Sequence, residues 1–514
     1  MARASKSSGG NRSRLPARQA PVQPPEPDCP AIQWQVLIIA GLFLAANGVG
    51  VFGGFVLDDL PLIVDHPRLH AIGEIPRHFA STLWPDRPGL ALYRPVTQTL
   101  WTLLWNAGGG SPFAFHLFNL VVGAAVPILL LFVLRSLAFG PAAAFAAALV
   151  FAAMPIHTEA AASIVGSAEL LAAAFGLGSL LAFVRRRDAL AVGLLALAVL
   201  SKEHAAALVA VGWMAAGPHR DRRWKTGVGA AVALLLVFWL RSRVASGWPA
   251  VPVIDNPASI LPAGTRVLTA LWVQCLYVWK AFVPIALSAD YSYKQIPLVM
   301  GMNDPRAWAG LGLAAASVVA GWRAGTVGAA VAAYWLLALP TSNLLFSVGT
   351  MMGERLAYLP SAALAALAGL GFVALSCRVP RRFAWALLTL VLVAYGARTA
   401  ARTFDWRSAD VFYATLVETS PGSAKSHYFF GAYLASRGDD VGAIAEYEKA
   451  ITIFPAYSEA LHNRGNALAR LGRLPEAAQS YRSVLRFDPG HAGARQNLMA
   501  IENGIPINPP RKKM

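Results

Sequence analysis

Long apolar segments separated by short polar ones dominate the chain from Ile32 to about Ala400. The first apolar run ends near Gly53 and is followed by a polar, Pro-rich stretch, after which apolar runs recur. These later runs cover approximately residues 112–134, 138–154, 163–184, 189–200, 204–217, 226–243, 266–287, 305–322, 326–340, 357–377 and 383–400. A straight membrane-spanning helix needs about 20 residues, so the shorter runs are expected to be broken, tilted or buried among other helices. The pattern predicts an all-α, polytopic membrane domain over residues 31–403.

The polar end of the chain carries an internal repeat. Small, aromatic and proline residues recur with a displacement of 34 residues, the tetratricopeptide period: Gly431, Ala443, Tyr447 and Pro455 return as Gly465, Ala477, Tyr481 and Pro489. Ala409, Tyr413 and Pro421 fit one period earlier. In such repeats the small residues let two helices approach, the tyrosine fills the gap and the proline stops the second helix. We expect a short α-helical solenoid over residues 404–503, which either offers a groove for a peptide or only caps the membrane domain.

Composition and charge support this division. The chain is 56% hydrophobic and 14% charged, with a mean hydropathy of +0.49. Its net charge of +17 comes largely from basic runs between apolar segments, namely Arg185 to Arg187, Arg220 to Lys225 and Arg378 to Arg382. Such runs are typical of cytoplasmic loops, and no nucleic-acid-binding motif accompanies them. This reading puts the tetratricopeptide end and a first loop, residues 54–111, on the external side, with roughly eleven spans.

The two ends of the chain are expected to be disordered or flexible. Residues 1–30 are rich in Ser, Pro and Arg and are interpreted as a disordered cytoplasmic tail, with the first apolar run as an uncleaved signal anchor. Residues 504–514 are interpreted as a basic, flexible end. The three cysteines show no metal-ligand spacing.

An acidic pair marks the start of the first external loop. Asp58 and Asp59 follow Phe55-Val56-Leu57 and precede Leu60-Pro61-Leu62. Acids just outside a span are often simply solvated, but apolar flanks desolvate a carboxylate, raise its pKa and favour proton abstraction from a hydroxyl. We therefore expect the pair to carry the chemistry.

Further polar clusters interrupt the apolar pattern on the same expected side. The first holds His157 and Glu159, and Glu169 follows within the next apolar run, where a carboxylate is costly unless it is paired. The acids near His157 either bind a divalent metal ion or hydrogen-bond. The second holds Lys202 and Glu203, which either neutralise one another or face a lipid phosphate.

Four residues in three further external patches complete the set of candidate site residues. Arg94 lies in the first loop within Tyr93-Arg94-Pro95, Asp290 lies in a later polar patch, and Glu354 and Arg355 are adjacent in another. The convergence of acids and cations in these loops contrasts with the cytoplasmic loops, which carry mostly Arg and Lys.

These motifs together resemble a known family. In chain order they read FVLDDLPLIVDHPRL, YRPVTQTLW, PIHTEAAASIVGSAELLAA, LSKEH, ALSADYSYKQIP and SNLLFSVGTMMGERLAYLPS, and tetratricopeptide repeats follow. The sequence is similar to the transmembrane and tetratricopeptide-repeat O-mannosyltransferases, which belong to the C-type class of lipid-linked glycosyltransferases. The similarity extends over nearly the whole chain from Phe55 onward.

The resemblance implies a function for the candidate residues. Asp58 and Asp59 lie where the class keeps its catalytic carboxylate, and we expect Asp58 to be the general base, with Asp59 as the second choice. The donor is a polyprenyl-phosphate sugar, typically mannose, and the acceptors are Ser or Thr hydroxyls of proteins. Arg94, Lys202 and Arg355 are candidate partners of the lipid phosphate, and His157 is a candidate hydrogen-bond donor.

The sequence also leaves alternatives open. The repeat array is much shorter than in many-repeat animal members, which fits a glycan or lipid acceptor as well as a protein. The Arg- and Ala-rich character favours a bacterial inner membrane and an undecaprenyl carrier. A non-catalytic scaffold with a tetratricopeptide tail needs only one span, and a transporter usually shows an inverted repeat that is not evident here.

Overall fold

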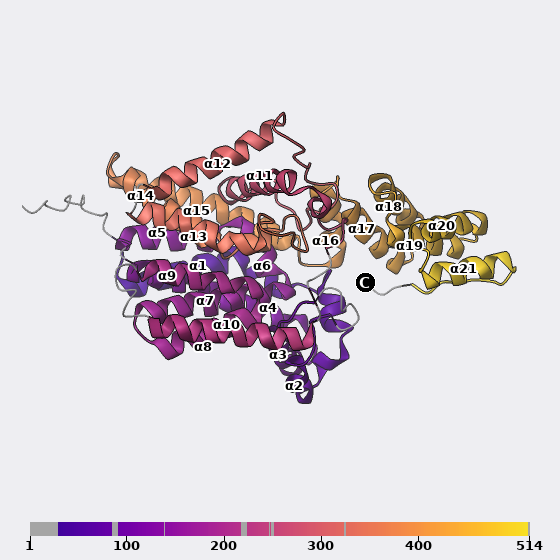
Figure 1. The fold of residues 1–514 in the computed structure, drawn as a ribbon, viewed down its shortest axis with the longest axis horizontal. Helices are drawn as coiled ribbons and strands as arrows, with labels where there is room; N and C mark the ends of the chain where they lie inside the picture. Colours follow the sequence, from indigo (N-terminus) through magenta and orange to yellow (C-terminus); the bar gives the residue numbers. More distant parts are fainter. Residues whose placement is uncertain are drawn as a thin grey trace, which may run out of the picture.

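A computed structural model describes residues 29–84, 91–137, 139–216, 224–245, 247, 251–322 and 325–511. Most of the tail expected over residues 1–30 and most of the basic run from Arg220 to Lys225 lie outside these ranges. The described residues form helices and no β-strand, which confirms the all-α prediction. The helices divide into a bundle and, beyond one end of it, a smaller array formed by the last part of the chain (Figure 1).

The bundle and the array follow one another along the chain. The bundle contains α1 (Ile32–Asn47), α2 (Ile75–His78), α3 (Pro95–Ala107), α4 (Pro112–Ser136), α5 (Pro141–Ala153), α6 (Thr158–Ala162), α7 (Ser167–Val184), α8 (Asp188–Ser201), α9 (Leu208–Ala215), α10 (Trp224–Val244), α11 (Ala263–Phe282), α12 (Pro305–Trp322), α13 (Gly325–Ala338), α14 (Ser361–Ser376) and α15 (Arg381–Phe404). The array contains α16 (Ala409–Thr419), α17 (Ala424–Arg437), α18 (Asp440–Ile453), α19 (Ser458–Arg470), α20 (Leu474–Phe487) and α21 (Ala492–Glu502).

Every apolar run predicted from the sequence contains a helix, but the lengths differ. Among the described residues, five helices are long and apolar enough to cross a membrane, or six if the bent pair of α5 and α6 counts as one span. The five are Ile32–Phe52, Pro112–Ser136, Ile164–Val184, Trp224–Val244 and Arg381–Phe404. The membrane character of the bundle is therefore supported, whereas the expected count of roughly eleven spans is not confirmed.

Helix α5 forms the centre of the bundle. Nearly all of its side chains are buried, and it packs against α1 and α4 on one side and α14 and α15 on the other. The close contact with α14 depends on Gly369, because a Cβ atom there would lie 2.2 Å from the carbonyl oxygen of Ala143. Small residues thus allow the backbones to approach, as is common between membrane helices.

A break after α5 places polar helix ends inside the bundle. Pro155 cannot continue the helical hydrogen bonds, and the axis bends by 52° between α5 and the short segment Pro155–Ala162. Gly166 then lets the chain return, because a Cβ atom there would lie 2.3 Å from the carbonyl oxygen of Ala160. Broken helices of this kind can hold polar groups at membrane depth only when protein surrounds them, and α6 is fully buried.

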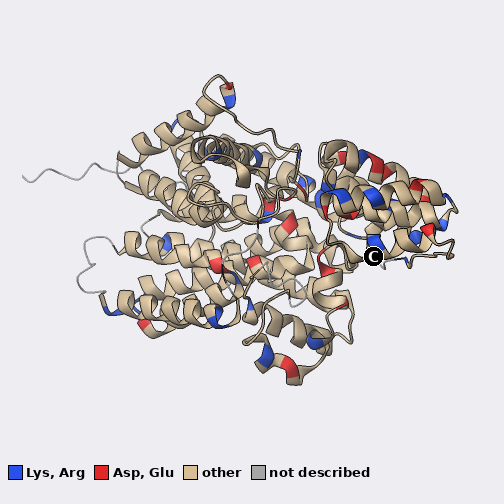
Figure 2. Ribbon diagram, turned by 45° about the vertical axis from the view of Figure 1, so that its right-hand side comes forward, with Lys and Arg blue, Asp and Glu red and all other residues tan. Residues whose placement is uncertain are grey.

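Charged side chains are unevenly distributed between the two parts. Figure 2 shows Lys, Arg, Asp and Glu scattered thinly over the bundle and densely over the array. Within the bundle, acids and bases meet mainly at the end that faces the array (Figure 2). This end is where the candidate residues of the sequence collect.

The array has the packing predicted for tetratricopeptide repeats. Gly431 faces the ring of Tyr447 and Gly465 faces the ring of Tyr481, with Cβ positions that would lie 2.9 Å and 2.7 Å from the nearest ring atoms. The small residues Ala443 and Ala477 are fully buried in the same helix pairs. The second helices of the two repeats end at Ile453 and Phe487, each two residues before the expected prolines, Pro455 and Pro489.

The half repeat α16 joins the array to the bundle. Its Tyr413 is fully buried and stacks on Tyr433 of α17 with 5.1 Å between ring centroids. The same apolar cluster includes Val56 and, at its margin, Leu57, the two residues before Asp58. The loop that follows α1 therefore packs directly on the start of the array.

The segment after α21 differs from the prediction. The sequence predicts a flexible end from residue 504, whereas residues up to Arg511 pack against the array and bond to it. A buried carboxylate on the array, that of Asp440, binds Arg511. Residues 512–514 lie outside the described part.

Candidate active site

The two acids of the first loop have different surroundings. Asp59 is fully buried, and its carboxylate accepts hydrogen bonds from the backbone N–H groups of Val56 at 3.0 Å and Val165 at 3.1 Å. Burial raises the pKa of Asp59 to about 7, while these two donors act in the opposite direction. The side chain of Asp58 keeps 36% of its surface exposed. Asp59 therefore ties the loop to the turn before α7, and Asp58 is the acid that a ligand can reach.

The backbone just before the pair is strained. Leu57 has a φ angle of 53°, in the left-handed region that a branched residue adopts only at a cost. The bonds of Asp59 and the packing of Leu57 against the array hold it there. This conformation fixes the direction in which the Asp58 side chain leaves the loop.

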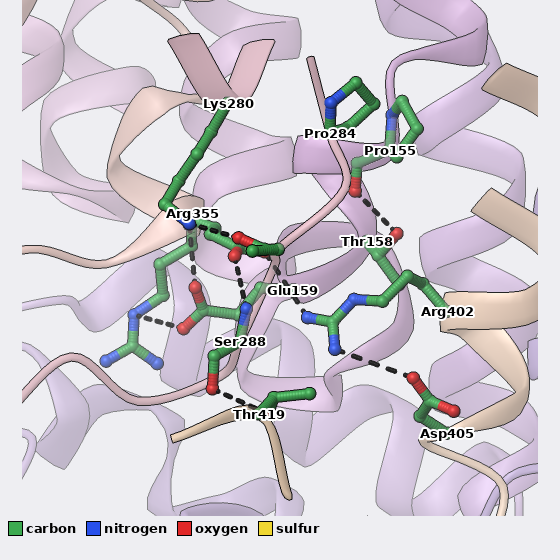
Figure 3. A network of polar contacts seen from close by, with 12 residues as sticks. Pro155, Thr158, Glu159, Lys280, Pro284, Ser288, Arg355, Arg402, Asp405 and Thr419 are labelled. Atoms are coloured by element: carbon green, nitrogen blue, oxygen red, sulfur yellow. Dashed lines mark hydrogen bonds and ion pairs between the residues drawn. The ribbon is translucent and has the colours of Figure 1, made fainter. Parts of the chain in front are cut away.

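Arg355 links Asp58 to the broken helix. Its Nη1 atom lies 3.9 Å from Oδ2 of Asp58, and its Nε atom lies 3.4 Å from Oε1 of Glu159. The backbone N–H of Arg355 also donates to Oε2 of Glu159 at 2.8 Å. Figure 3 shows the Glu159 carboxylate facing the Arg355 side chain. The first loop, α6 and the loop before α14 thus meet at one guanidinium.

A second buried group lies at the ends of α7 and α8. Lys202 donates to Glu169, and His204 Nε2 lies 3.2 Å from the other oxygen of the same carboxylate. All three side chains are buried. Glu169 is therefore paired, as its place in an apolar run required. The alternative in which Lys202 and Glu203 neutralise one another is wrong, because Lys202 turns inward to Glu169.

Glu203 instead pairs with Arg94. The guanidinium binds the carboxylate through two bonds, from Nη2 at 2.7 Å and from Nε at 3.0 Å. The Glu203 side chain is 51% exposed, so water screens this pair more than the buried one. Burial and the positive charges of Arg94 and Arg355 lower the pKa of Lys202, against the raising effect of Glu169. The charges of Arg94 and Arg355 therefore both act on Lys202.

Glu354 does not point into this region, although it is adjacent to Arg355. Its buried carboxylate accepts from the backbone N–H of Ser288 at 2.6 Å and from the hydroxyl of Tyr291, and it lies 3.4 Å from Arg402. Figure 3 shows the Arg402 guanidinium facing the Asp405 carboxylate, with Nη1 of Arg402 3.6 Å from Oδ2 of Asp405. Glu354 is the centre of a separate structural network.

Two other predicted residues are bonded to the core and to the array. His157 is buried in the core, where Nε2 bonds the hydroxyl of Ser361 at 2.7 Å. Asp290 bonds Ser423 and Ser426 at the start of α17. His157 is therefore bonded within the protein core, and Asp290 helps to dock the array on the bundle.

Several residues were missed by the sequence reading. Arg402 appears only as the last basic residue of an apolar helix, and its partner lies 48 positions away. Lys425 of α17 pairs with Asp255 at 2.5 Å, and Asp255, Asp290 and Asp58 raise its pKa against the lowering effect of burial. The charge of Asp58 thus contributes to raising the pKa of Lys425, a residue of the array. No local pattern signals either residue.

No grouping in the described residues has the form of a metal site. Three or more His, Cys, Asp or Glu side chains do not come together anywhere in this part of the chain. Glu159 bonds Arg355 and His157 bonds Ser361 instead. The arrangement supplies a reachable carboxylate, nearby cations and a docked repeat array.

Comparison with known protein families gives two matches. Residues 246–318 match the family model described as "Protein O-mannosyl-transferase TMTC, DUF1736", and residues 458–491 match a tetratricopeptide repeat. The first match covers the loop that docks on the array together with α11 and most of α12.

Curated relatives match over most of the chain. Protein O-mannosyl-transferase TMTC3 of Homo sapiens is 27% identical over 87% of this chain and 54% of its own length. TMTC4 of Homo sapiens is 27% identical over 80% of this chain and 66% of its own length, and F38B6.6 of Caenorhabditis elegans is 27% identical over 79% and 61%. The chain spans about half the length of the first of these relatives. The matches confirm that this chain resembles the transmembrane and tetratricopeptide-repeat O-mannosyltransferase family.

Proposed function

We propose that the protein transfers a sugar, mannose by resemblance, from a polyprenyl-phosphate carrier to Ser or Thr hydroxyls of proteins. The observation that carries the proposal is the placement of Asp58. Its partly exposed carboxylate lies 3.9 Å from the Arg355 guanidinium, where the repeat array docks on a membrane bundle. The similar human proteins TMTC3 and TMTC4 are named protein O-mannosyl-transferases, the same reaction class.

Asp58 acts as the general base in this proposal. The acceptor hydroxyl oxygen attacks the anomeric carbon of the sugar, and its proton passes to the Asp58 carboxylate. The bond between the anomeric carbon and the phosphate oxygen breaks, and the lipid phosphate leaves with its electron pair. Asp59 is not in contact with the acceptor and holds the loop through Val56 and Val165.

The departing phosphate is stabilised by the cations around Lys202. Arg355 and Arg94 each have an acidic partner, but their charges still disfavour the charged form of Lys202. An anion placed among the three side chains relieves this repulsion, as in other sites built for developing negative charge. Arg94 is the most adaptable of them, because its partner Glu203 is half exposed.

The acceptor approaches from the side of the array. Helices α16 and α17 contact the residues before Asp58, and Lys425 lies at the same junction. An acceptor protein held by the array is thereby kept near the base. We propose that this end of the bundle faces the external, periplasmic side of a bacterial inner membrane, because the described basic runs, Arg185 to Arg187 and Arg378 to Arg382, follow the far ends of α7 and α14.

The test is transfer from a panel of radiolabelled polyprenyl-phosphate sugars in membranes that contain the protein or lack it. The panel includes mannose and glucose donors on undecaprenyl and dolichyl carriers, with and without EDTA. Label on protein that depends on the chain supports the proposal, and alkaline release of the label identifies a Ser or Thr linkage. Label only in extracted lipid or glycan assigns the other acceptor class. An absence of label with every donor would contradict a transferase and favour a scaffold.

A further inference from the structure

The segment that follows α21 lies on the array like a bound peptide. The chain leaves the helix through Gly504, which has a φ angle of 68°, and residues 505–511 follow without regular secondary structure. In Figure 1 the last part of the trace runs from α21 back beside the array toward the bundle. Its contacts are with earlier repeats, so it does not continue the solenoid.

Three alternate positions of this segment make the contacts. Ile507 packs against the apolar cluster that runs from α18 to α21 and includes Leu468 and Leu498. Pro509 is buried, and its carbonyl oxygen accepts a bond from Nη1 of Arg470 at 3.3 Å. In an extended peptide every second side chain points to the same side, so alternate residues contact the surface on which the peptide lies.

Arg511 makes the most specific contact. Its Nη1 atom donates to the carbonyl oxygen of Ala435 at 2.8 Å and to Oδ1 of Asp440 at 3.0 Å, and its Nη2 atom donates to Oδ2 of Asp440 at 2.9 Å. Ala435 lies in the last turn of α17, where the helix dipole favours a cation. A planar guanidinium that binds two carboxylate oxygens fixes geometry as well as charge.

The surface of the array that binds Arg511 is stable without the segment. The Asp440 side chain is only 3% exposed, and Arg470 donates to it from Nε at 3.0 Å and from Nη2 at 2.7 Å. If Arg511 leaves, Asp440 keeps this partner and is not left as an isolated buried charge, which would be strongly unfavourable. We call Ala435, Asp440 and Arg470 the Asp440 edge.

We propose that the Asp440 edge is a peptide-docking site for extended segments with an apolar residue, a proline and an arginine at alternate positions, and that Ile507–Arg511 is its resident ligand. The prolines around Pro509 restrict the free segment to extended conformations, so little conformational entropy is lost when it docks. This site is independent of the proposed transferase chemistry, since none of its residues touches Asp58 or its partners.

The experiment measures binding of a fluorescein-labelled peptide of residues 505–514 by fluorescence anisotropy. The receiving protein is the chain truncated after Gly504, in detergent, and the intact chain is the control. We expect saturable binding to the truncated chain and at least about tenfold weaker binding to the intact chain, whose site is filled. A peptide with Arg511→Ala should bind the truncated chain about tenfold or more weakly, as expected for loss of a charged hydrogen-bonded pair.

A second variant covers the case in which truncation unfolds the array. The full-length chain with Arg511→Ala keeps its segment but loses the guanidinium, and it should admit the wild-type peptide more readily than the intact chain does. Circular dichroism establishes which proteins are folded. Equal peptide binding by the intact and variant chains, no binding by a folded truncated chain, or equal affinity of the Ala peptide would each overturn the proposal.

Discussion

Asp58 and Asp59 are adjacent in the chain, yet their carboxylates lie in opposite environments. The Asp58 side chain is 36% exposed and 3.9 Å from Arg355, whereas Asp59 is fully buried between two backbone N–H donors. Asp58 can therefore contact a substrate, whereas Asp59 holds the loop in place. The difference leads to distinct predictions for the two acids.

Replacing Asp59 with Asn should destabilise the protein. The amide offers one acceptor oxygen where the carboxylate offers two, so either Val56 N–H or Val165 N–H loses its bond. An unpaired buried donor costs about 1–3 kcal/mol. The expected result is a lower thermal unfolding midpoint in detergent than that of the wild type.

The size of this loss should depend on pH. Because burial raises the pKa of Asp59 to about 7, the folded protein binds this proton more tightly than the unfolded chain does. The stabilisation by Asp59 is therefore complete below about pH 4 and is lost as the pH rises through about 7. The difference in midpoint between wild type and Asp59→Asn should shrink over this range. A difference that grows with pH would contradict the assignment.

The pair of Glu354 and Arg402 should be essential to the junction near α15. Both side chains are almost completely buried and lie 3.4 Å apart. Arg402→Met leaves Glu354 without its cation, and breaking a buried pair from one side typically costs about 3–5 kcal/mol. We expect a large loss of thermal stability in detergent for the single variant.

The double variant Glu354→Gln/Arg402→Met provides the control for this pair. It removes both charges, so it should be markedly more stable than Arg402→Met alone, since Ser288 and Tyr291 can still bond the amide oxygen of the glutamine. Equal losses in the single and double variants would show that the two side chains are not coupled.

Gly465→Val should destabilise the array. The new Cβ atom would lie 2.7 Å from a ring atom of Tyr481, and overpacking of this kind costs about 1–3 kcal/mol. Gly490→Ala is the matched control in the same array, because its Cβ atom meets only an Asp488 oxygen at 3.4 Å. Limited proteolysis should cleave the array sooner in the first variant than in the second. Similar cleavage rates would contradict the predicted packing.

The features that the sequence predicts well are local ones. Apolar runs predict helices because a buried helix needs apolar residues on all sides. The 34-residue period identifies the tetratricopeptide repeat, in which the small residue of the first helix packs against the tyrosine of the second, and so it predicts the contact between Gly465 and Tyr481. The cost of a carboxylate in an apolar run likewise predicts that Glu169 has a partner. These inferences need no knowledge of distant parts of the chain.

The remaining features depend on distant packing. Lys202 and Glu203 are neighbours, but the first bonds Glu169 and the second bonds Arg94, 109 positions away. Glu354 and Arg355 likewise turn in different directions in one short helical turn. Which way such a side chain points is set by the elements packed around it, and those contacts are not encoded at neighbouring positions.

The most direct test of the account is the initial rate of sugar transfer by Asp58→Asn, with Asp59→Asn and wild type measured at equal folded protein. Removal of a general base should lower the rate by about a hundredfold or more, while binding of the polyprenyl-phosphate donor, measured in the same detergent, stays close to wild type. Asp59→Asn should keep a substantial rate per folded molecule. A rate for Asp58→Asn within about twofold of wild type would contradict its role as the base.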